Sequence, residues 1–271
     1  MSGAEPTSLP LEERVALVTG AGRGIGRATA HRLGRDGAAV AVNDLDPSAA
    51  EAVVDELQAA GVRAVAVAGD VTDEEAVAAV VATASSGLGP VDVLVNNAGG
   101  APPGAMWSGG GGGGDAPQWA SVLDTPTAQF EAFLRLNLVS AYICSRAVLP
   151  GMLERGRGAI VCVSSIVAET GQRNGAGYAV GKAGLHALVA SLSKEVGPHG
   201  VRVNGVVLSN APHPVRTAER QHVLDAATHL GRVGAYEEFA AAIAFLVGPD
   251  SSYLAGTMVP VDGGTHRSTL F

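Results

Sequence analysis

The stretch from Val15 to about Asp36 restricts the fold more than any other part of the chain. The short apolar run Val15-Ala-Leu-Val-Thr19 has the length of a buried strand, and it leads into Gly20-Ala-Gly-Arg-Gly-Ile-Gly26. The residues after this turn have the pattern of a helix. A glycine turn between a strand and a helix lets the backbone approach a phosphate closely, and the helix start offers free N–H groups. The glycines are spaced G-x-x-x-G-x-G rather than G-x-G-x-x-G. A plain connection is the alternative, but the context favours a nucleotide loop.

Short apolar runs and helical stretches alternate along the rest of the chain. Further strands are predicted at 38–43, 63–68, 91–95, 159–163 and 201–207, and helices at 47–60, 73–86, 127–154, 175–196 and 236–247. This alternation predicts right-handed βαβ units and an α/β fold, a doubly wound parallel sheet with helices on both faces. We expect one domain over 14–271, after a loose leader at 1–13. Ligands of such sheets bind beyond the carboxyl ends of the strands. The segments that follow predicted strand ends are 19–26, Asp44, Asp70-Val71 and 96–99.

Asp44 is the residue expected to select the cofactor. It lies at the distance from Gly26 where dinucleotide-binding folds place an acid, about 20 positions on, to accept hydrogen bonds from ribose hydroxyls. Such a carboxylate repels a 2′-phosphate and so favours NAD. A helix cap or turn residue is the alternative role. Arg23, a cation inside the glycine turn, weakens the discrimination against NADP.

Composition excludes several classes of partner. The chain has 271 residues, a net charge of −8 and no basic block, so we expect neither nucleic acid nor an anionic membrane as a partner. We find no signal peptide at 1–10 and expect no apolar stretch near the ~20 residues that span a bilayer. The two cysteines, Cys144 and Cys162, lack metal-ligand spacing. We interpret them as buried free thiols of a cytoplasmic protein and expect no metal site.

The segment from Gly100 to about Pro126 interrupts the alternation. It holds six consecutive glycines, Gly109–Gly114, and both tryptophans of the chain, Trp107 and Trp119. A polyglycine run has high chain entropy, so a disordered surface loop is the favoured interpretation. The alternative is a lid over a substrate pocket, with Met106 or the tryptophans as apolar contacts.

Tyr178-Ala-Val-Gly-Lys182 carries the clearest chemistry. Residues four apart on a helix lie on nearly the same face, so the Tyr178 hydroxyl and the Lys182 ammonium are expected to act on one small volume. A nearby cation favours the phenolate and lowers a phenol's pKa, which suits proton exchange with an alcohol or carbonyl oxygen. Ser165 ends the strand predicted at 159–163 and would donate to that oxygen. Taken alone, each of these residues is more often an ordinary surface or turn residue.

The motifs together resemble those of one enzyme family. Thr19-Gly20, Gly24-Ile25-Gly26, Asp70-Val71, Asn96-Asn97-Ala98-Gly99, Asn137, Ser165 and Tyr178-x-x-x-Lys182 occur in order at fitting spacings. Over about residues 12–264 the chain resembles the short-chain dehydrogenase/reductase (SDR) family, of the compact single-domain type. The joint pattern is specific, although each motif alone is weak. The resemblance implies a Rossmann-like sheet of about seven strands, a nicotinamide cofactor and a homotetramer or homodimer.

The resemblance also implies a role for each matching residue. Tyr178 would be the general acid/base, and Lys182 would lower its pKa and bind the nicotinamide ribose. Ser165 would hold the substrate oxygen, while the neighbouring Ser164 should point to the other face of its strand. Asn137 would support a water-mediated proton path from Lys182. The expected cofactor-binding residues are Gly20, Arg23, Gly24, Ile25, Gly26, Asp44, Asp70, Val71, Asn97, Ala98, Gly99, Tyr178 and Lys182.

One segment departs from the family pattern. After the strand at 201–207 the family has Pro-Gly and soon a Thr against the nicotinamide. This chain has Leu208-Ser209 and then Asn210-Ala-Pro-His-Pro214, with no Thr before Thr217. We therefore expect the nicotinamide amide to be held differently. His213 is a candidate for the pocket, although a lone loop histidine is more often plain surface.

The main functional hypothesis is NAD-dependent interconversion of a secondary alcohol and a ketone by hydride transfer. The first alternative is an NADPH-dependent ketoreductase similar to 3-oxoacyl reductases, motivated by Arg23. The second is a dinucleotide-binding protein without turnover, motivated by Leu208-Ser209. The substrate is expected to be a small molecule of unspecified identity.

Overall fold

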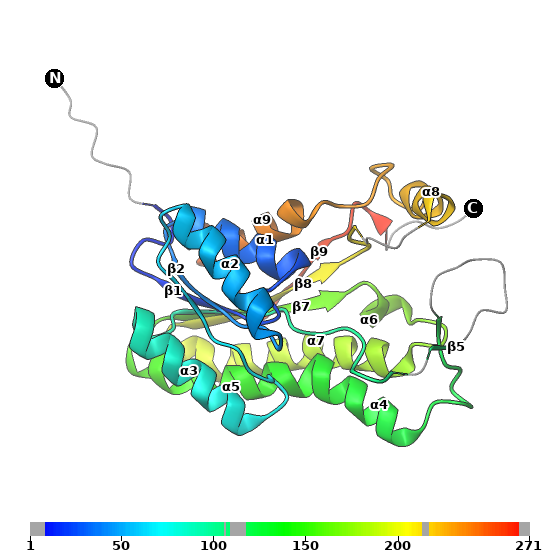
Figure 1. Cartoon of the computed structure of the whole chain (residues 1–271), viewed down its shortest axis with the longest axis horizontal. Helices are drawn as coiled ribbons and strands as arrows, with labels where there is room; N and C mark the ends of the chain where they lie inside the picture. Colours follow the sequence, from blue (N-terminus) through cyan, green and yellow to red (C-terminus); the bar gives the residue numbers. More distant parts are fainter. Residues whose placement is uncertain (1–8, 106, 109–117, 213–216, 266–271) are drawn as a thin grey trace.

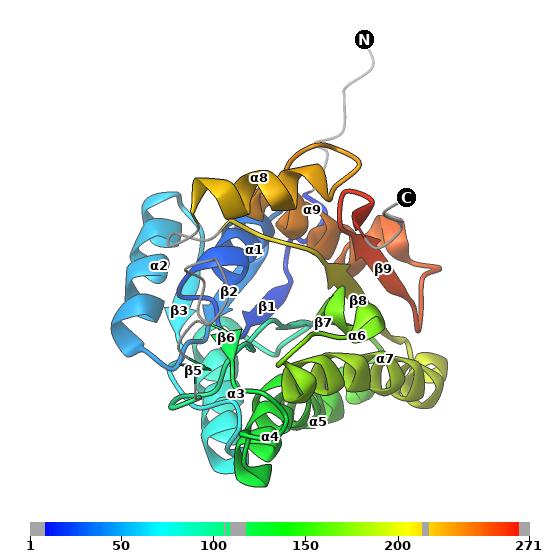
Figure 2. The same cartoon turned by 90° about the vertical axis from the view of Figure 1, so that its right-hand side faces the viewer.

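The fold is a single parallel sheet covered by helices on both faces (Figures 1 and 2). The computed structural model describes residues 9–105, 107–108, 118–212 and 217–265. The sheet has seven strands in the order β3-β2-β1-β4-β7-β8-β9. Their bounds are β1 Val15–Val18, β2 Ala39–Val42, β3 Ala64–Ala66, β4 Val93–Asn96, β7 Gly158–Ser165, β8 Val201–Leu208 and β9 Met258–Val261. All neighbouring pairs are parallel. The predicted doubly wound sheet is confirmed.

Helices occupy the connections between the strands. Their bounds are α1 Gly24–Arg35, α2 Pro47–Ala59, α3 Glu74–Leu88, α4 Thr127–Leu134, α5 Ser140–Glu154, α6 Val167–Thr170, α7 Ala176–Val196, α8 Ala218–Ala226 and α9 Tyr236–Val247. A π-helical turn, η1 (Arg135–Val139), joins α4 to α5, and short 3-10 turns occur at Gly197–His199 and Pro249–Ser251. The starts of two helices follow from local chemistry. Asp46 accepts a hydrogen bond from the Ser48 amide ahead of α2, and Asp73 accepts one from the Ala76 amide ahead of α3.

Two apolar cores lie on opposite faces of the sheet. Side chains of a strand alternate between faces, so Ala16 and Val18 face α1, α2 and α9, while Val15 and Leu17 face α3, α5 and α7. Figure 1 shows these two helical layers above and below the sheet. Leu11 is buried in the first core and its amide donates to Asp36 O at 2.8 Å. The described end of the expected leader is therefore part of the folded domain.

The strand order reverses beside β1. The chain runs from β1 outward to β3, then returns to add β4 on the other side of β1. The loop after β1 and the loop after β4 therefore run to opposite sides of the sheet. A crevice opens between two such loops at the carboxyl ends of their strands. Figure 2 looks onto that side of the molecule. This is where the predicted glycine turn and the segment after β4 lie.

The insertion after β4 is partly ordered. Trp107–Ser108 (β5) and Gln118–Trp119 (β6) form an antiparallel pair in which Trp107 is opposite Trp119. The expectation of a wholly disordered loop is therefore wrong at its base, because backbone pairing holds the two ends together. Met106 and the Gly109–Gly114 run lie outside the described residues, so the lid hypothesis stays a prediction.

Among the residues that the structure describes, one helical run is long and apolar enough to cross a membrane by length and composition. Thr127–Glu154 spans 28 residues through α4, η1 and α5, so the expectation that no stretch reaches this length is wrong. A helix in the core of a globular protein passes the same test. In this fold the run packs against α3, α7, β4 and β7.

Candidate functional site

The glycine turn is held in place by Thr19 and Asn97. The Thr19 hydroxyl accepts from the backbone amides of Asn97 and Ala98, both at 3.0 Å. The Asn97 side-chain amide donates to the carbonyls of Thr19 and Gly20, both at 2.9 Å. The segment after β4 thus braces the turn after β1. Asn97 was expected to line the cofactor, but its side-chain amide is engaged with the turn itself. Sequence reasoning gave the Thr19 side chain no role.

The turn is shaped to admit a phosphate group. Gly20 and Gly24 have φ of +60° and +57°, values that disfavour a side chain. A Cβ at Gly26 would collide with Gly20 O and the Asn97 amide. Arg23 is the N-cap of α1 but makes no side-chain cap hydrogen bond, so the first N–H groups of this 12-residue helix have no side-chain cap. Gly24, Ile25 and Gly26 form that first turn, and this arrangement fits a dinucleotide diphosphate.

Asp44 lies against the same turn. One carboxylate oxygen accepts from Gly22 N at 2.9 Å, and the other accepts from Asp46 N at 3.1 Å. Asp46, not Asp44, caps α2, so the alternative role of a helix cap belongs to its neighbour. Arg23 is exposed and makes no ion pair with any residue in the described ranges. The acid therefore faces the turn without a neutralising partner there.

Asp70, the second acidic residue expected at the cofactor, does not contact the glycine turn as Asp44 does. Asp70 is exposed, and its carboxylate accepts from the Thr72 amide at 2.8 Å. Val71 beside it is buried and belongs to the core under β2. Both lie in the segment after β3, on the side of the sheet where β2 carries Asp44. Their role in flanking the adenine stays a prediction.

Ser165 and Tyr178 form the centre of the candidate site. Ser165 is the last residue of β7, and Tyr178 lies in the first turn of α7. Their side chains are hydrogen-bonded to each other. Burial raises the pKa of the Tyr178 phenol, and the hydrogen bond from Ser165 opposes that change. The pair presents two hydroxyl groups at one point beyond the sheet.

The Lys182 ammonium lies over the Tyr178 ring and is bonded to the backbone of β7. It donates to Val163 O at 2.8 Å and lies 5.8 Å from the centroid of the Tyr178 ring. The residue is only 4% exposed, and burial lowers the pKa of the ammonium to about 8. The net shift of the Tyr178 pKa is upward, and the lowering expected from Lys182 stays a prediction. Desolvation of the phenol, which raises its pKa, outweighs the Ser165 hydrogen bond, which lowers it.

Asn137 sits in the π-helical turn. Its side chain forms a two-bond ring with Gly100, accepting from the amide and donating to the carbonyl, both at 2.8 Å. It also donates to Phe133 O at 3.0 Å, one helical turn back. A Cβ at Gly99 would lie 2.8 Å from Asn137 Oδ1 and 2.9 Å from Lys182 Nζ. Only glycine at this position leaves the space between the amide and the ammonium open.

The divergent segment after β8 has its own anchor. β8 ends at Leu208, which is buried, and Ala211 packs against the core. The Tyr236 hydroxyl donates to Pro212 O at 2.7 Å, and its ring lies near the glycine turn at Gly24. Tyr236 is a residue that sequence reasoning missed, since nothing in the local pattern pairs it with position 212. His213 and Pro214 lie outside the described residues.

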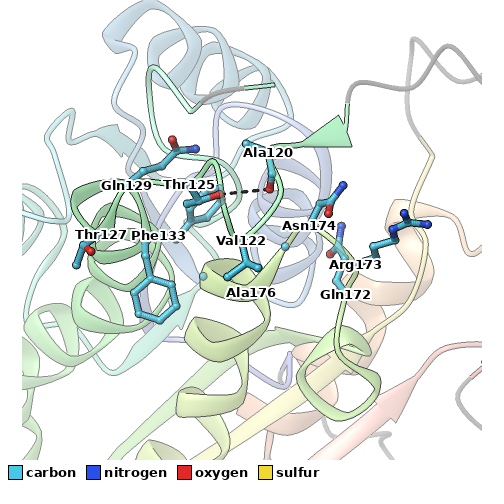
Figure 3. Close-up of a pocket in the computed structure, with 13 residues that line it drawn as sticks. Ala120, Val122, Thr125, Thr127, Gln129, Phe133, Gln172, Arg173, Asn174 and Ala176 are labelled. Atoms are coloured by element: carbon cyan, nitrogen blue, oxygen red, sulfur yellow. Dashed lines mark hydrogen bonds between the residues drawn. The ribbon is translucent and has the colours of Figure 1, made fainter. Parts of the chain in front are cut away.

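A cavity of about 560 Å³ opens beside the start of α7 (Figure 3). Its walls come from the end of the insertion, the first turns of α4 and the segment that leads into α7. The lining includes Val122, Phe130, Phe133, Gln172 and Asn174. The cavity reaches Gly177, the residue before Tyr178, so it adjoins the candidate site. Within the described ranges, no three His, Cys, Asp or Glu side chains are grouped to hold a metal ion.

Comparison with known proteins identifies the family. The model of the family described as short chain dehydrogenase matches residues 14–225. The chain is 36% identical over 261 residues to 7alpha-hydroxysteroid dehydrogenase of Escherichia coli (strain K12), covering 95% of this chain and 96% of the relative. It is 34% identical over 264 residues to 3-oxoacyl-[acyl-carrier-protein] reductase FabG of Pseudomonas aeruginosa, covering 96% and 100%.

A solved structure agrees with these sequence matches. It is a 7 alpha-hydroxysteroid dehydrogenase complexed with NADH and 7-oxo glycochenodeoxycholic acid, with a TM-score of 0.85 and 34% identity. The match covers 95% of this chain and 96% of that one. The chain belongs to the short-chain dehydrogenase family and is an oxidoreductase that interconverts alcohols and ketones with a nicotinamide dinucleotide.

Proposed function

We propose that Tyr178 is the general acid/base of this reaction and that Ser165 holds the substrate oxygen. The observation that carries the proposal is the hydrogen bond between these two side chains at the end of β7. A substrate oxygen placed between the two hydroxyls would receive a hydrogen bond from Ser165 while it exchanges a proton with Tyr178. The nicotinamide ring, when bound, supplies or accepts the hydride.

The protonation of Tyr178 bears on the direction of the reaction. With its pKa raised, the phenol carries its proton at neutral pH and is ready to protonate the oxygen of a ketone as it is reduced. Oxidation of an alcohol needs the phenolate. We therefore propose that reduction is the faster direction near pH 7 and that the rate of oxidation rises with pH.

Lys182 and Asn137 have supporting roles in the proposal. The buried Lys182 ammonium and the Asn137 amide face the same opening at Gly99, where a Cβ would lie 2.9 Å from Nζ and 2.8 Å from Oδ1. We propose that this opening is the start of a proton path behind Tyr178, with Lys182 also binding the nicotinamide ribose. Alanine at position 99 would close the opening without touching Tyr178.

Tyr178→Phe tests the central assignment. Removing the hydroxyl leaves the ring in place, so the fold and the binding of dinucleotide should persist while turnover falls by a factor on the order of 10² or more. Turnover is measured on a panel of secondary alcohols and ketones, with NADH binding followed by fluorescence. Tyr253→Phe is the matched control, because Tyr253 is fully exposed. A Tyr178→Phe enzyme with near wild-type turnover would sink the proposal.

The preferred cofactor is proposed to be NAD. The Asp44 carboxylate at the glycine turn supports this choice, since it would accept bonds from ribose hydroxyls and repel a 2′-phosphate. Asp44→Asn keeps the shape and removes the charge, so kcat/KM for NADP should rise relative to that for NAD. An unchanged ratio would count against the ribose role.

An NADPH-dependent ketoreductase is the second candidate. Exposed Arg23 within the turn supports it, because a guanidinium there could pair with a 2′-phosphate. Arg23→Gln would then weaken NADP use selectively. The family match and the paired Ser165 and Tyr178 hydroxyls favour either enzyme over a silent dinucleotide-binding protein.

The assembly and location of the protein are also proposals. We propose a homotetramer or homodimer on the basis of family membership, tested by sedimentation equilibrium against the 27.1 kDa of one chain. A cytoplasmic location is supported by the thiols of Cys144 and Cys162, both free and buried. Cell fractionation tests it.

A further inference from the structure

Ser164 precedes Ser165, the residue proposed to hold the substrate oxygen, but its side chain points to the opposite face of β7. It is 2% exposed, and its side chain enters the interface between β7 and α7. The Ser164 hydroxyl lies 3.0 Å from Lys182 O and 3.0 Å from His186 Nε2. These three residues therefore meet at a single buried point behind the proposed acid/base group.

The direction of each hydrogen bond follows from proton counting. A backbone carbonyl only accepts, so the single Ser164 proton is committed to Lys182 O. His186 Nε2 must then be the donor to Ser164 Oγ. The neutral ring is thus fixed as the tautomer with its proton on Nε2. Protonation adds a proton at Nδ1 and leaves this bond intact, so the arrangement holds in both charge states of His186.

The arrangement fixes Lys182 at both ends. Its ammonium donates to Val163 O, and its backbone carbonyl accepts from the Ser164 hydroxyl, so consecutive residues of β7 hold the side-chain tip and the main chain of one residue. His186 follows Lys182 by one helical turn, so its backbone amide bonds the same carbonyl within α7. The strand and the helix are tied together at the level where Lys182 enters the site.

We propose that Ser164 and His186 are a positioning pair that fixes Lys182 relative to Tyr178 from the far side of the site. The pair touches neither substrate nor cofactor. It sets the register of α7 on the end of β7, and therefore the geometry of Ser165, Tyr178 and Lys182 together. This inference rests on the assignment of Tyr178 as the acid/base group.

Ser164→Ala tests the pair, because it removes one oxygen atom and with it the hydrogen bonds to Lys182 O and His186 Nε2. With the bonds lost, kcat for the best ketone of the panel should fall on the order of tenfold, because small misplacement of catalytic groups is costly. The apparent pKa in the pH profile of kcat should change by about half a unit or more, because the Lys182 ammonium moves relative to Tyr178. KM for the ketone should change less than kcat. Ser164→Thr retains the hydroxyl and should recover most of the loss.

His186 offers an independent pair of variants if Ser164→Ala folds poorly. His186→Gln keeps a donor that reaches Ser164, whereas His186→Leu has none, so the Leu variant should lose more kcat and shift the profile further. Ser193→Ala is the matched control, since Ser193 is a buried serine on the same helix, farther from Lys182. It should leave kcat and the profile at wild-type values.

Two results would overturn the positioning role. One is wild-type kcat and pH profile in folded Ser164→Ala or His186→Leu. The other is equal impairment in Ser164→Thr and Ser164→Ala, which would assign the effect to side-chain shape rather than to the hydroxyl. Tyr178→Phe is assayed in parallel, so full turnover in that variant would reject the proposed function separately.

Discussion

At the scale of single residues, burial decides the protonation of the groups in the site. Lys182 is buried and Tyr178 is half-buried, and desolvation favours the neutral form of each group. The pKa of the ammonium falls to about 8 and the pKa of the phenol rises. Near neutral pH a charged lysine and a protonated tyrosine still coexist, which is the combination that proton donation to a ketone requires.

Lys182 should make the free energy of unfolding depend on pH in a definite window. In the unfolded chain the amine titrates near 10.5, and in the folded chain near 8. Below pH 8 the ammonium is charged in both states and its burial destabilises the fold. Between about pH 8 and 10.5 the folded state gives up its proton first, so this penalty is relieved and stability rises, by at most about 3 kcal/mol.

Urea unfolding of wild type and Lys182→Met at about pH 7, 9 and 10.5 checks this window. The difference between the two proteins is the quantity to follow. Burial raises the pKa of the Cys144 thiol to about 12, so this thiol lowers stability at high pH equally in both proteins and cancels. The Cys162 thiol, with its pKa raised to about 11, interacts with the Lys182 charge, so both proteins are compared in a Cys162→Ala background. A difference that stays flat across the window would show that Lys182 is not depressed in the folded state.

At the scale of elements, three glycines on α7 allow a close crossing with α4 and η1. Gly177, Gly181 and Gly184 lie three or four residues apart, so they share one helical face. A Cβ at Gly181 would lie 2.9 Å from Asn137 Cβ, and one at Gly177 would lie 2.9 Å from Phe133 Cβ. This crossing brings Asn137 to the level of Lys182. It depends on the absence of side chains on α7.

Gly181→Ala should therefore destabilise the protein and reduce turnover. Overpacking at the crossing costs about 1–3 kcal/mol, partly offset by the roughly 1 kcal/mol better helix propensity of alanine. Chemical denaturation and kcat on the best ketone measure the two effects. Gly197→Ala at the end of the same helix is the control, because a Cβ there meets nothing within 4 Å. Equal stability of the two variants would contradict the close crossing.

Tyr236 links two further elements, the start of α9 and the divergent segment after β8. Tyr236→Phe removes the hydrogen bond to Pro212 O and leaves the ring by Gly24. The loss in stability should be small, about 0.5–1.5 kcal/mol, while KM for the cofactor or the ketone should rise severalfold as the segment loosens. Steady-state kinetics beside Tyr253→Phe check this. Unchanged KM values would show that the hydrogen bond from Tyr236 to Pro212 O does not affect binding of the cofactor or the ketone.

At the scale of the whole molecule, the site is assembled from loops that leave seven parallel strands at one edge. A ligand that binds only this assembled edge stabilises the entire domain by mass action. At a free concentration of 100 times Kd, NADH should raise the free energy of unfolding by about 2.7 kcal/mol. Thermal unfolding with NADH and NADPH at equal concentrations measures this. A larger shift with NADPH in the wild type would reverse the proposed cofactor preference.

Much of the fold could be predicted from local sequence. The helix predicted at 236–247 coincides with α9, and the predicted strands lie within a few residues of β1, β2, β3, β4, β7 and β8. Apolar periodicity and helix caps such as Asp46 and Asp73 act within a few residues, so they can be read from the chain alone. The glycine turn, Asp44, residues 97–99 and Ser165 were predicted to share a site because they lie at strand ends, and Tyr178 and Lys182 because they lie four residues apart on a predicted helix.

The tertiary structure alone decided how those residues act on one another. The π-helical turn at Asn137, the glycine face of α7 and the Ser164–His186 pair join segments far apart in sequence, and no local pattern encodes such contacts. The direction of the Tyr178 pKa shift is the clearest case. The sequence places a lysine four residues away, but the phenol's protonation depends on how much water the packed helices and sheet exclude, which is a property of the folded molecule.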